Sequence, residues 1–216
     1  MMSAQGEIYT NEAKMFTGLI REFATIKSFS GEKLTLKSSY KPKIGDSIAI
    51  NGACLTVTEV AWGGFSVELS HESQKILATE NLRGRAHMEP AMQMGDRFEG
   101  HIVQGHIDCV GEITRIDRSS KAYDYYIKVP EKYIRLIPPK GSVAVDGISL
   151  TVNETFDDSF RLTIIPHTLQ TTLFGDYKVG RRVNIETDVL ARYMAHIFAP
   201  KKSLTWDEVE KIQAMY

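Results

Sequence analysis

The sequence has 216 residues, of which 43% are hydrophobic and 25% are charged, proportions typical of a soluble globular protein. Its 26 lysines and arginines nearly balance its 27 aspartates and glutamates, so the charge does not favour a nucleic acid or an anionic membrane as partner. No apolar run approaches the roughly 18 residues of a transmembrane helix, and no signal-peptide pattern follows the start. With only two cysteines, too few for a disulfide framework, we expect a cytoplasmic protein.

Short strand-like segments dominate the first half of the chain. In order they lie at 23–29, 33–38, 45–50, 51–60 and 65–69. The segment "NGACLTVTEV" alternates apolar and polar residues, breaks at "AWGG" and resumes as "FSVEL", which predicts a β-hairpin. A short helix is expected at 71–80. The strand pattern is then interrupted at 88–104, where we place the boundary between two domains.

The second half follows the same order. Strand-like segments lie at 109–116, 123–129, 141–145, 146–155 and 160–165, and a short helix is expected at 131–137. The segment "DGISLTV" begins a second predicted hairpin, which breaks at "FDDS" and resumes as "FRLTII". Many short strands with Gly, Pro and Asp turns favour an all-β fold with a closed or nearly closed antiparallel barrel in each half.

The two hairpins repeat each other. A shift of 95 residues aligns 51–73 with 146–168 without a gap, and six of the 23 positions are then identical. The identical pairs are Gly52/Gly147, Leu55/Leu150, Thr56/Thr151, Val57/Val152, Glu59/Glu154 and Phe65/Phe160. Because the apolar alternation stays in phase, the sequence predicts two copies of one domain. The matched position Cys54/Ser149 holds a thiol in one copy and a hydroxyl in the other.

The tail is helical in pattern. From Thr187 onward, apolar residues recur at helical spacing, Pro200 interrupts them, and Ser203 or Thr205 can cap a second helix. Two interpretations remain open for the first, unusually apolar helix: it packs on its own barrels, or it forms a seam between identical subunits.

The candidate chemistry is sparse when it is judged from the residues alone. Cys54 is either a partly exposed nucleophile or a small buried hydrophobe. His101 and His106 lack the cysteine or carboxylate spacing of a zinc site, so no metal is expected. Gly100 and Gly105 indicate points of close backbone approach. The remaining histidines singled out, His71, His87 and His196, are interpreted as surface or satisfied core residues.

Six segments together resemble the riboflavin synthase family, whose members carry two lumazine-binding repeats. They are "MFTGLI" (15–20), "NGACLTVTEV" (51–60), "GDRFEGHIVQGHID" (95–108), "DGISLTVNE" (146–154), "IIPHTLQTTLFG" (164–175) and "VNIETDVLARY" (183–193). The resemblance implies two tandem six-stranded antiparallel Greek-key barrels at 15–102 and 103–188 and a C-terminal helical oligomerisation tail at 189–216. It also implies a homotrimer, and a polar N-terminal extension at 1–14 that we expect to be disordered.

The activity implied is that of a transferase without metal or redox cofactor. Two molecules of 6,7-dimethyl-8-ribityllumazine would exchange a four-carbon unit and give riboflavin and 5-amino-6-(D-ribitylamino)uracil. Such a reaction needs two stacked ligands, a base for the acidic methyl group on C7 of one ring, and a nucleophile for the other ring. Lumazine synthase, which supplies the substrate, is a further partner suggested by the pathway.

The resemblance also assigns site residues. The first repeat would hold one lumazine through Gly18, Leu19, Ile20, Cys54, Leu55, Thr56, Glu68, Leu69, Ser70, His71, Glu72 and Ser73, with Gly105, His106 and Ile107 closing the pocket. The second repeat would use Lys140, Ser149, Leu150, Thr151, Thr163, Ile164, Ile165, Pro166, His167 and Thr168, with Asp188 near the reacting rings. His167 stands where the family usually has glutamate.

The catalytic roles follow from the unequal pair of repeats. His106 would transfer protons, since imidazole titrates near neutral pH. Cys54 would assist addition at C7 of the ring, or would only pack against it. Ser149, Thr151 and Asp188 would orient the partner ligand and shuttle protons. The alternative function is that of a lumazine or flavin antenna protein, which has the same repeats and binds the ligand without converting it.

Overall fold

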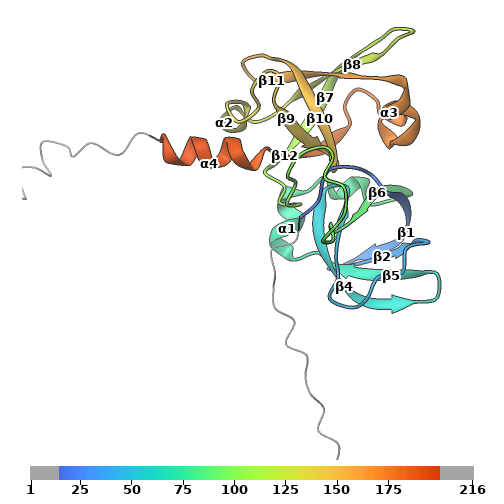
Figure 1. Cartoon of the computed structure of the whole chain (residues 1–216). Coiled ribbons are helices and arrows are strands. Elements are labelled where there is room, and N and C mark those ends of the chain that lie inside the picture. The colour runs from blue at the N-terminus through green and yellow to red at the C-terminus, as the bar shows by residue number, and fades with distance from the viewer. Residues whose placement is uncertain (1–14, 200–216) are drawn as a thin grey trace, which may run out of the picture.

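Two β-barrels, one above the other in Figure 1, make up the body of the protein in the computed structural model, which describes residues 15–199. The predicted extension at 1–14 and the predicted second helix after Pro200 lie outside the described residues. Barrel 1 contains β1 (Glu22–Ser30), β2 (Lys33–Lys37), β3 (Ser47–Ile50), β4 (Ala53–Ala61), β5 (Gly64–Glu68) and β6 (Arg85–Pro90). Barrel 2 contains β7 (Cys109–Arg118), β8 (Tyr123–Lys128), β9 (Ser142–Val145), β10 (Ile148–Thr155), β11 (Ser159–Ile164) and β12 (Arg182–Thr187).

Both barrels are closed, antiparallel and built in the same order. Around barrel 1 the strands follow β1-β2-β5-β4-β3-β6, and around barrel 2 the equivalent strands keep that order. The pairing is irregular at the same place in both, between Val57 and Glu59 in β4 and between Val152 and Glu154 in β10, which is the signature of a β-bulge. The predicted pair of six-stranded antiparallel barrels is therefore confirmed.

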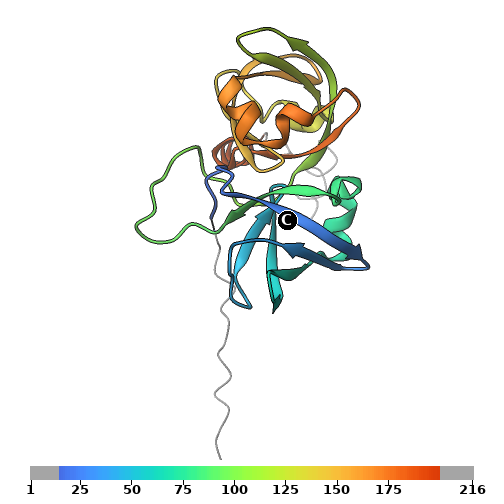
Figure 2. The ribbon, with the colours of Figure 1, turned by 90° about the vertical axis from the view of Figure 1, so that its right-hand side faces the viewer.

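Short helices cover the strand connections. They are α1 (His71–Ile76), α2 (Glu131–Ile134), α3 (Pro166–Thr171), α4 (Val189–Ile197) and the 3₁₀ turns η1 (Thr79–Asn81) and η2 (Leu173–Asp176). The helices expected at 71–80 and 131–137 are thus confirmed, in shorter form. A wide loop joins β6 to β7 beside the junction of the barrels, drawn in green in Figure 2. Within residues 15–199, no helix is long and apolar enough to cross a membrane.

Each barrel has its own apolar core. The inward positions of β4, Leu55 and Val57, are buried while Thr56 between them is exposed, as the alternation in the sequence predicts. In barrel 2 the largest buried side chains are aromatic, and the Tyr125 hydroxyl donates to the Phe174 carbonyl at 2.7 Å. Burying a large apolar side chain contributes roughly 1.5–3 kcal/mol, so these two clusters dominate the stability of the fold.

The dipeptides Asn51-Gly52 and Asp146-Gly147 form the two-residue turns between β3 and β4 and between β9 and β10. All four turn residues have positive φ: 44° at Asn51, 83° at Gly52, 46° at Asp146 and 82° at Gly147. A type I′ turn demands this conformation at both central positions, which favours Asn-Gly and Asp-Gly. A Cβ added to Gly52 would lie 2.7 Å from the Gly147 nitrogen, so the two turns meet at the junction of the barrels.

A buried histidine of barrel 1 fastens the two barrels together. His87 Nδ1 lies 3.0 Å from the Asp146 carbonyl, and the Leu173 N–H donates to His87 Nε2 at 2.8 Å. A carbonyl only accepts and an N–H only donates, so the imidazole is neutral with its proton on Nδ1. Burial lowers the pKa of His87 to about 3. His87 is therefore a satisfied core residue, as interpreted from the sequence.

An asparagine of barrel 2 makes the matching pair of bonds. Asn184 Nδ2 donates to the Asn51 carbonyl at 2.9 Å, and the Ala78 N–H donates to Asn184 Oδ1 at 2.8 Å. His87 and Asn184 thus reach across the junction in opposite directions. Each side chain makes two hydrogen bonds to backbone groups of the other repeat, and these bonds hold the barrels in one relative orientation.

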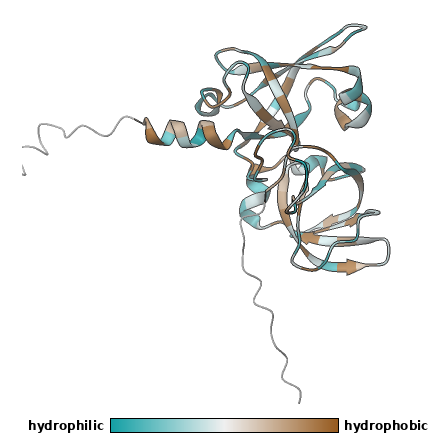
Figure 3. Ribbon diagram, viewed as in Figure 1, coloured by the Kyte–Doolittle hydropathy of each residue, from teal (hydrophilic) through white to brown (hydrophobic). Residues whose placement is uncertain are grey.

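The helix α4 leaves the body of the molecule and carries an exposed apolar side. Its N-cap is Asp188, whose carboxylate accepts from the Leu190 N–H at 2.9 Å. Figure 3 shows apolar positions along its length. Its exposed apolar residues are Leu190, Tyr193, Met194, Ile197 and Phe198. Of the two interpretations of this helix, packing on its own barrels is wrong for these side chains.

The free energy of unfolding is expected to decrease between pH 7 and pH 4 because of His87, whose pKa is about 3 in the fold against 6.5 unperturbed. In that interval His87 becomes protonated in the unfolded chain but stays neutral in the folded protein. The stability that its neutral state contributes is therefore present above pH 6.5 and is lost as the pH falls. Linkage gives a loss of about 3 kcal/mol by pH 4.

The variant His87→Asn, which cannot titrate and copies Asn184, should lose about 3 kcal/mol less than the wild type over this range in urea denaturation. The buried acids are common to both proteins and cancel in this difference. Equal losses in the two proteins would contradict the neutral assignment of His87.

Candidate active site

Two short segments, 16–18 and 103–105, run side by side between the barrels. The Phe16 N–H donates to the Val103 carbonyl at 2.7 Å, and the Val103 N–H donates back to the Phe16 carbonyl at 3.1 Å. One segment precedes the first strand of barrel 1 and the other precedes the first strand of barrel 2. They are therefore equivalent parts of the two repeats.

Each segment crosses to the barrel of the other repeat. The Ser149 N–H in β10 donates to the Gly18 carbonyl at 2.8 Å, and the Cys54 N–H in β4 donates to the Gly105 carbonyl at 2.9 Å. Ile20 also packs against the core of barrel 2. The expected grouping of Gly18 and Ile20 with Cys54 is therefore wrong, because the chain crosses the junction before it enters β1.

Both crossings need glycine. The φ angles are 78° at Gly18 and 77° at Gly105, and an added Cβ would lie 2.6 Å from Ser149 Cβ and 2.5 Å from Cys54 Cβ respectively. Real Cβ atoms do not approach so closely, and L residues avoid this φ. Cys54 and Ser149 thus occupy matched positions, each covered by a bare backbone. The close approach predicted at Gly105 is confirmed.

Two buried carboxylates hold the crossing segments. Glu89 in β6 accepts from the Thr17 N–H at 2.7 Å and from the Gly18 N–H at 3.0 Å. Glu186 in β12 accepts from the N–H groups of Gln104 and Gly105, both at 2.8 Å. Burial raises the pKa of both acids, that of Glu186 to about 7, although the accepted hydrogen bonds act in the opposite direction.

Ser149 has a histidine partner that the sequence did not single out for this site. His101 Nδ1 lies 2.7 Å from Ser149 Oγ, and the His101 N–H donates to the Thr17 carbonyl at 3.2 Å. The side chain is buried, and this burial lowers the pKa of His101, while the charge of Asp188 raises it. Gly100 is also crowded, since an added Cβ would lie 2.2 Å from the Thr17 carbonyl oxygen.

The other predicted residues of the Cys54 side surround the ends of β4 and β5. His106 is exposed next to Gly105, and Thr56 is exposed, whereas Leu55, Leu69 and Ile107 are buried in the core of barrel 1. Ser70 caps α1 by accepting from the Ser73 N–H at 3.1 Å. Glu68, His71 and Glu72 are exposed, and Leu19 is half-buried. The polar residues at the end of β5 are therefore accessible to solvent.

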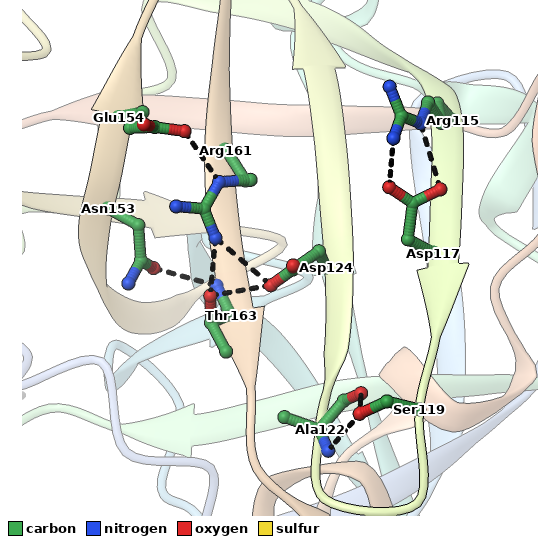
Figure 4. A network of polar contacts seen from close by, with 9 residues as sticks. All are labelled: Arg115, Asp117, Ser119, Ala122, Asp124, Asn153, Glu154, Arg161 and Thr163. Atoms are coloured by element: carbon green, nitrogen blue, oxygen red, sulfur yellow. Dashed lines mark hydrogen bonds and ion pairs between the residues drawn. The ribbon is translucent and has the colours of Figure 1, made fainter.

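On the Ser149 side, Thr163 is committed to barrel 2. Its N–H donates to Asn153 Oδ1 at 2.8 Å and its hydroxyl donates to Asp124 Oδ1 at 2.6 Å, within the network drawn in Figure 4. Arg161 joins the same Asp124 carboxylate at 3.2 Å. The N–H and the hydroxyl of Thr163 therefore both donate hydrogen bonds within barrel 2.

The remaining predicted residues of the Ser149 side differ in accessibility. Lys140, Thr151, Ile165, Pro166 and His167 are exposed, Leu150, Thr168 and Asp188 are half-buried, and Ile164 is buried. Lys140 has φ of 66° and its N–H donates to the Val152 carbonyl at 2.8 Å. Pro166 occupies the first turn of α3, where a missing N–H costs nothing.

Sequence reasoning missed Glu89, Glu186 and His101. A second repeat offset would have indicated the acids, since they are 97 residues apart in the equivalent strands β6 and β12. His101 left no such signal, because its contact with Ser149 depends on the path of a long loop. Across residues 15–199, no group of three or more His, Cys, Asp or Glu side chains is arranged to hold a metal ion.

Comparison with known proteins matches these features to one family. The lumazine binding domain family matches residues 17–87 and 104–188. The chain is 41% identical over 198 residues to riboflavin synthase of Photobacterium phosphoreum, covering 87% of this chain and 91% of the relative. The chain belongs to the riboflavin synthase family. This family is one of transferases, and the protein is an enzyme of that class.

A second relative agrees with this membership, and solved structures share the fold. Riboflavin synthase of Bacillus subtilis is 39% identical over 189 residues, covering 83% of this chain and 88% of the relative. The solved structures of LumP complexed with 6,7-dimethyl-8-(1'-D-ribityl) lumazine and with riboflavin share the fold, with TM-scores of 0.70 and 0.71 at 20% and 21% identity. Both cover 80% of this chain and 99% of the LumP chain.

The substitutions Gly18→Ala and Gly105→Ala are each expected to lower the free energy of unfolding by about 2–4 kcal/mol, since steric overlap adds to backbone strain. Gly31→Ala is the matched control, because Gly31 has φ of 61° and nothing within 4 Å of an added Cβ. It should cost only the strain, about 1 kcal/mol, in urea denaturation. A loss no larger at Gly18 and Gly105 than at Gly31 would refute the close packing.

Proposed function

We propose that this protein is a riboflavin synthase that dismutates two molecules of 6,7-dimethyl-8-ribityllumazine. A four-carbon unit would pass from one molecule to the other and give riboflavin and 5-amino-6-(D-ribitylamino)uracil, with no metal or redox cofactor. The observation that carries the proposal is the matched but unequal pair Cys54 and Ser149, each beneath a crossing glycine. Two like pockets with unlike side chains suit a reaction between two copies of one molecule.

In the Cys54 half-site, the segment 103–105 brings His106 to the same barrel end as the thiol. The Gly105 carbonyl accepts from the Cys54 N–H, so the next residue along, His106, starts beside it. We assign His106 to proton transfer at the C7 methyl group, since the two ring nitrogens of an imidazole can accept and donate a proton. Cys54 would assist addition at C7 of the ring.

In the Ser149 half-site, the hydroxyl, Thr151 and Asp188 would orient the second ligand and move protons. Ser149 and Thr151 are two residues apart in β10 and so lie on the same face of the strand. The Asp188 carboxylate caps α4 just after β12. Of the remaining residues named in the sequence, the exposed ones at the end of β5 and in α3 would line the ring and ribityl chain, and Gly18 and Ile20 would belong to the Ser149 half-site. The polar groups of the ring would pair with backbone at the ends of the strands, which is the usual way of binding such heterocycles.

The exposed side of α4 supports a homotrimer. The five apolar residues on this side are more than half exposed, for example Tyr193 at 61% and Phe198 at 72%, and an exposed stripe of this kind marks a contact surface. In a trimer the Cys54 half-site of one chain would face the Ser149 half-site of a neighbour. A cytoplasmic location and association with lumazine synthase remain predictions.

The test is to incubate the purified protein with 6,7-dimethyl-8-ribityllumazine alone and follow riboflavin absorbance. We expect riboflavin to form, and expect Cys54→Ser and His106→Ala each to lower kcat by roughly 10²-fold, the usual contribution of acid–base and nucleophilic groups. Binding without conversion would favour the antenna function instead.

Cys109→Ala is the matched control for the thiol. Cys109 lies in the core of barrel 2, and burial raises its pKa to about 12, so it stays a neutral thiol. This variant should turn over like the wild type. If Cys54→Ser and His106→Ala both stayed within about twofold of the wild type, the assigned roles would fail.

A further inference from the structure

The Ser149 hydroxyl lies in an enclosed part of the junction. Gly18 crosses above it, and an added Cβ on Gly100 would lie 3.3 Å from Ser149 Oγ. Both glycines have left-handed backbone, with φ of 78° and 80°. Two segments, one before β1 and one between β6 and β7, therefore approach Ser149 through glycine backbone, and the His101 side chain contacts its hydroxyl.

His101 is held through both its backbone and its side chain. Its N–H donates to the Thr17 carbonyl at 3.2 Å, and its Nδ1 lies 2.7 Å from Ser149 Oγ. The residue is only 8% exposed. The Ser149 hydroxyl, which would otherwise rotate among three staggered positions, is thus held in one.

The second ring nitrogen of His101 has no partner. Nε2 is buried and makes no hydrogen bond with any described residue. Buried polar atoms are normally paired, so an unpaired one at a candidate binding site is available to a ligand or to a water molecule. A neutral imidazole bonded through one nitrogen has the other available as a single donor or acceptor, depending on the tautomer.

The opposite half-site uses its histidine differently. His106 follows the segment that covers Cys54 and is exposed, whereas His101 is buried against Ser149. An exposed imidazole suits proton exchange with solvent, and a buried imidazole bonded to a hydroxyl suits the orientation of that hydroxyl. The two histidines of "HIVQGH" therefore belong to different half-sites.

We propose that His101 is the positioning residue of the Ser149 half-site: Nδ1 fixes the Ser149 hydroxyl, and Nε2 binds a carbonyl oxygen or ring nitrogen of the heterocycle held in barrel 2. This inference rests on the proposed function for the identity of the ligand. His101 acts on the reaction through Ser149 and contributes to ligand affinity through Nε2.

The first test is a double-mutant cycle on the dissociation constant of riboflavin, followed by flavin fluorescence quenching. His101→Ala and Ser149→Ala should each weaken binding about tenfold, and the double variant should be within about threefold of the weaker single, because the residues are coupled. In the control cycle of His101→Ala with Cys54→Ser the effects should multiply. Multiplying effects in the His101–Ser149 cycle, or unchanged affinity, would overturn the proposal.

The second test separates the two nitrogens. An asparagine amide reaches the place of Nδ1 and a glutamine amide reaches that of Nε2. His101→Asn should keep kcat within about threefold of the wild type and raise KM, whereas His101→Gln should lower kcat about as far as Ser149→Ala, by roughly 10-fold to 100-fold. A purely structural role would not split kcat from KM in this way. Glutamine equal to or better than asparagine would overturn the proposal.

Failure of this inference is distinguishable from failure of the proposed function. The wild type either forms riboflavin or does not, and that outcome decides the function without any His101 variant. The binding cycle needs no turnover, so it decides the role of His101 even in a protein that only binds flavins. Urea midpoints equal to that of the wild type establish that each variant is folded before it is compared.

Discussion

The close approach of two glycine turns is the constraint on which the junction depends. Gly52 and Gly147 meet backbone to backbone, and an added Cβ on either would lie within 3 Å of the other. The residues before them, Asn51 and Asp146, have positive φ and also use their side chains as acceptors, from the N–H groups of His87 and Asn184 at 2.9 and 2.8 Å. One pair of dipeptides therefore sets the turn type, the spacing of the barrels and the strands that line the junction.

The arrangement of the two proposed half-sites, around Cys54 and around Ser149, follows from this spacing. Cys54 and Ser149 are each two residues beyond a turn glycine, so their placement at the junction is a consequence of the turns. The buried acids Glu89 and Glu186 then hold the crossing segments over them. Because the turns and the buried acids are the same in both repeats, single side chains can differ without disturbing the fold. The thiol of Cys54 and the hydroxyl of Ser149 are the clearest such difference.

Much of this was predictable from local pattern. Two antiparallel barrels could be predicted from the alternation at "NGACLTV" and "DGISLTV" and from the turn dipeptides, because both patterns depend on neighbours in the sequence. The repeat offset then shows that the two halves are equivalent. The crossing of Gly18 to Ser149 was not predictable, since a repeat alignment shows which segments are equivalent but not which barrel each one touches. The contact of His101 with Ser149 was not predictable for a related reason, since the two residues are 48 positions apart and His101 lies in a loop without periodicity.

The reciprocal crossing gives the molecule the form of a two-fold homodimer whose subunits exchange their N-terminal arms. Segment 16–18 covers the barrel of the second repeat, and segment 103–105 covers that of the first. If the two repeats were identical and unlinked, each would close the pocket of its twin. The loop from β6 to β7 thus acts as a covalent tether between two units that are arranged like subunits. Such a tether lets one repeat hold a serine and a buried histidine where the other holds a thiol, a difference that two identical subunits cannot have.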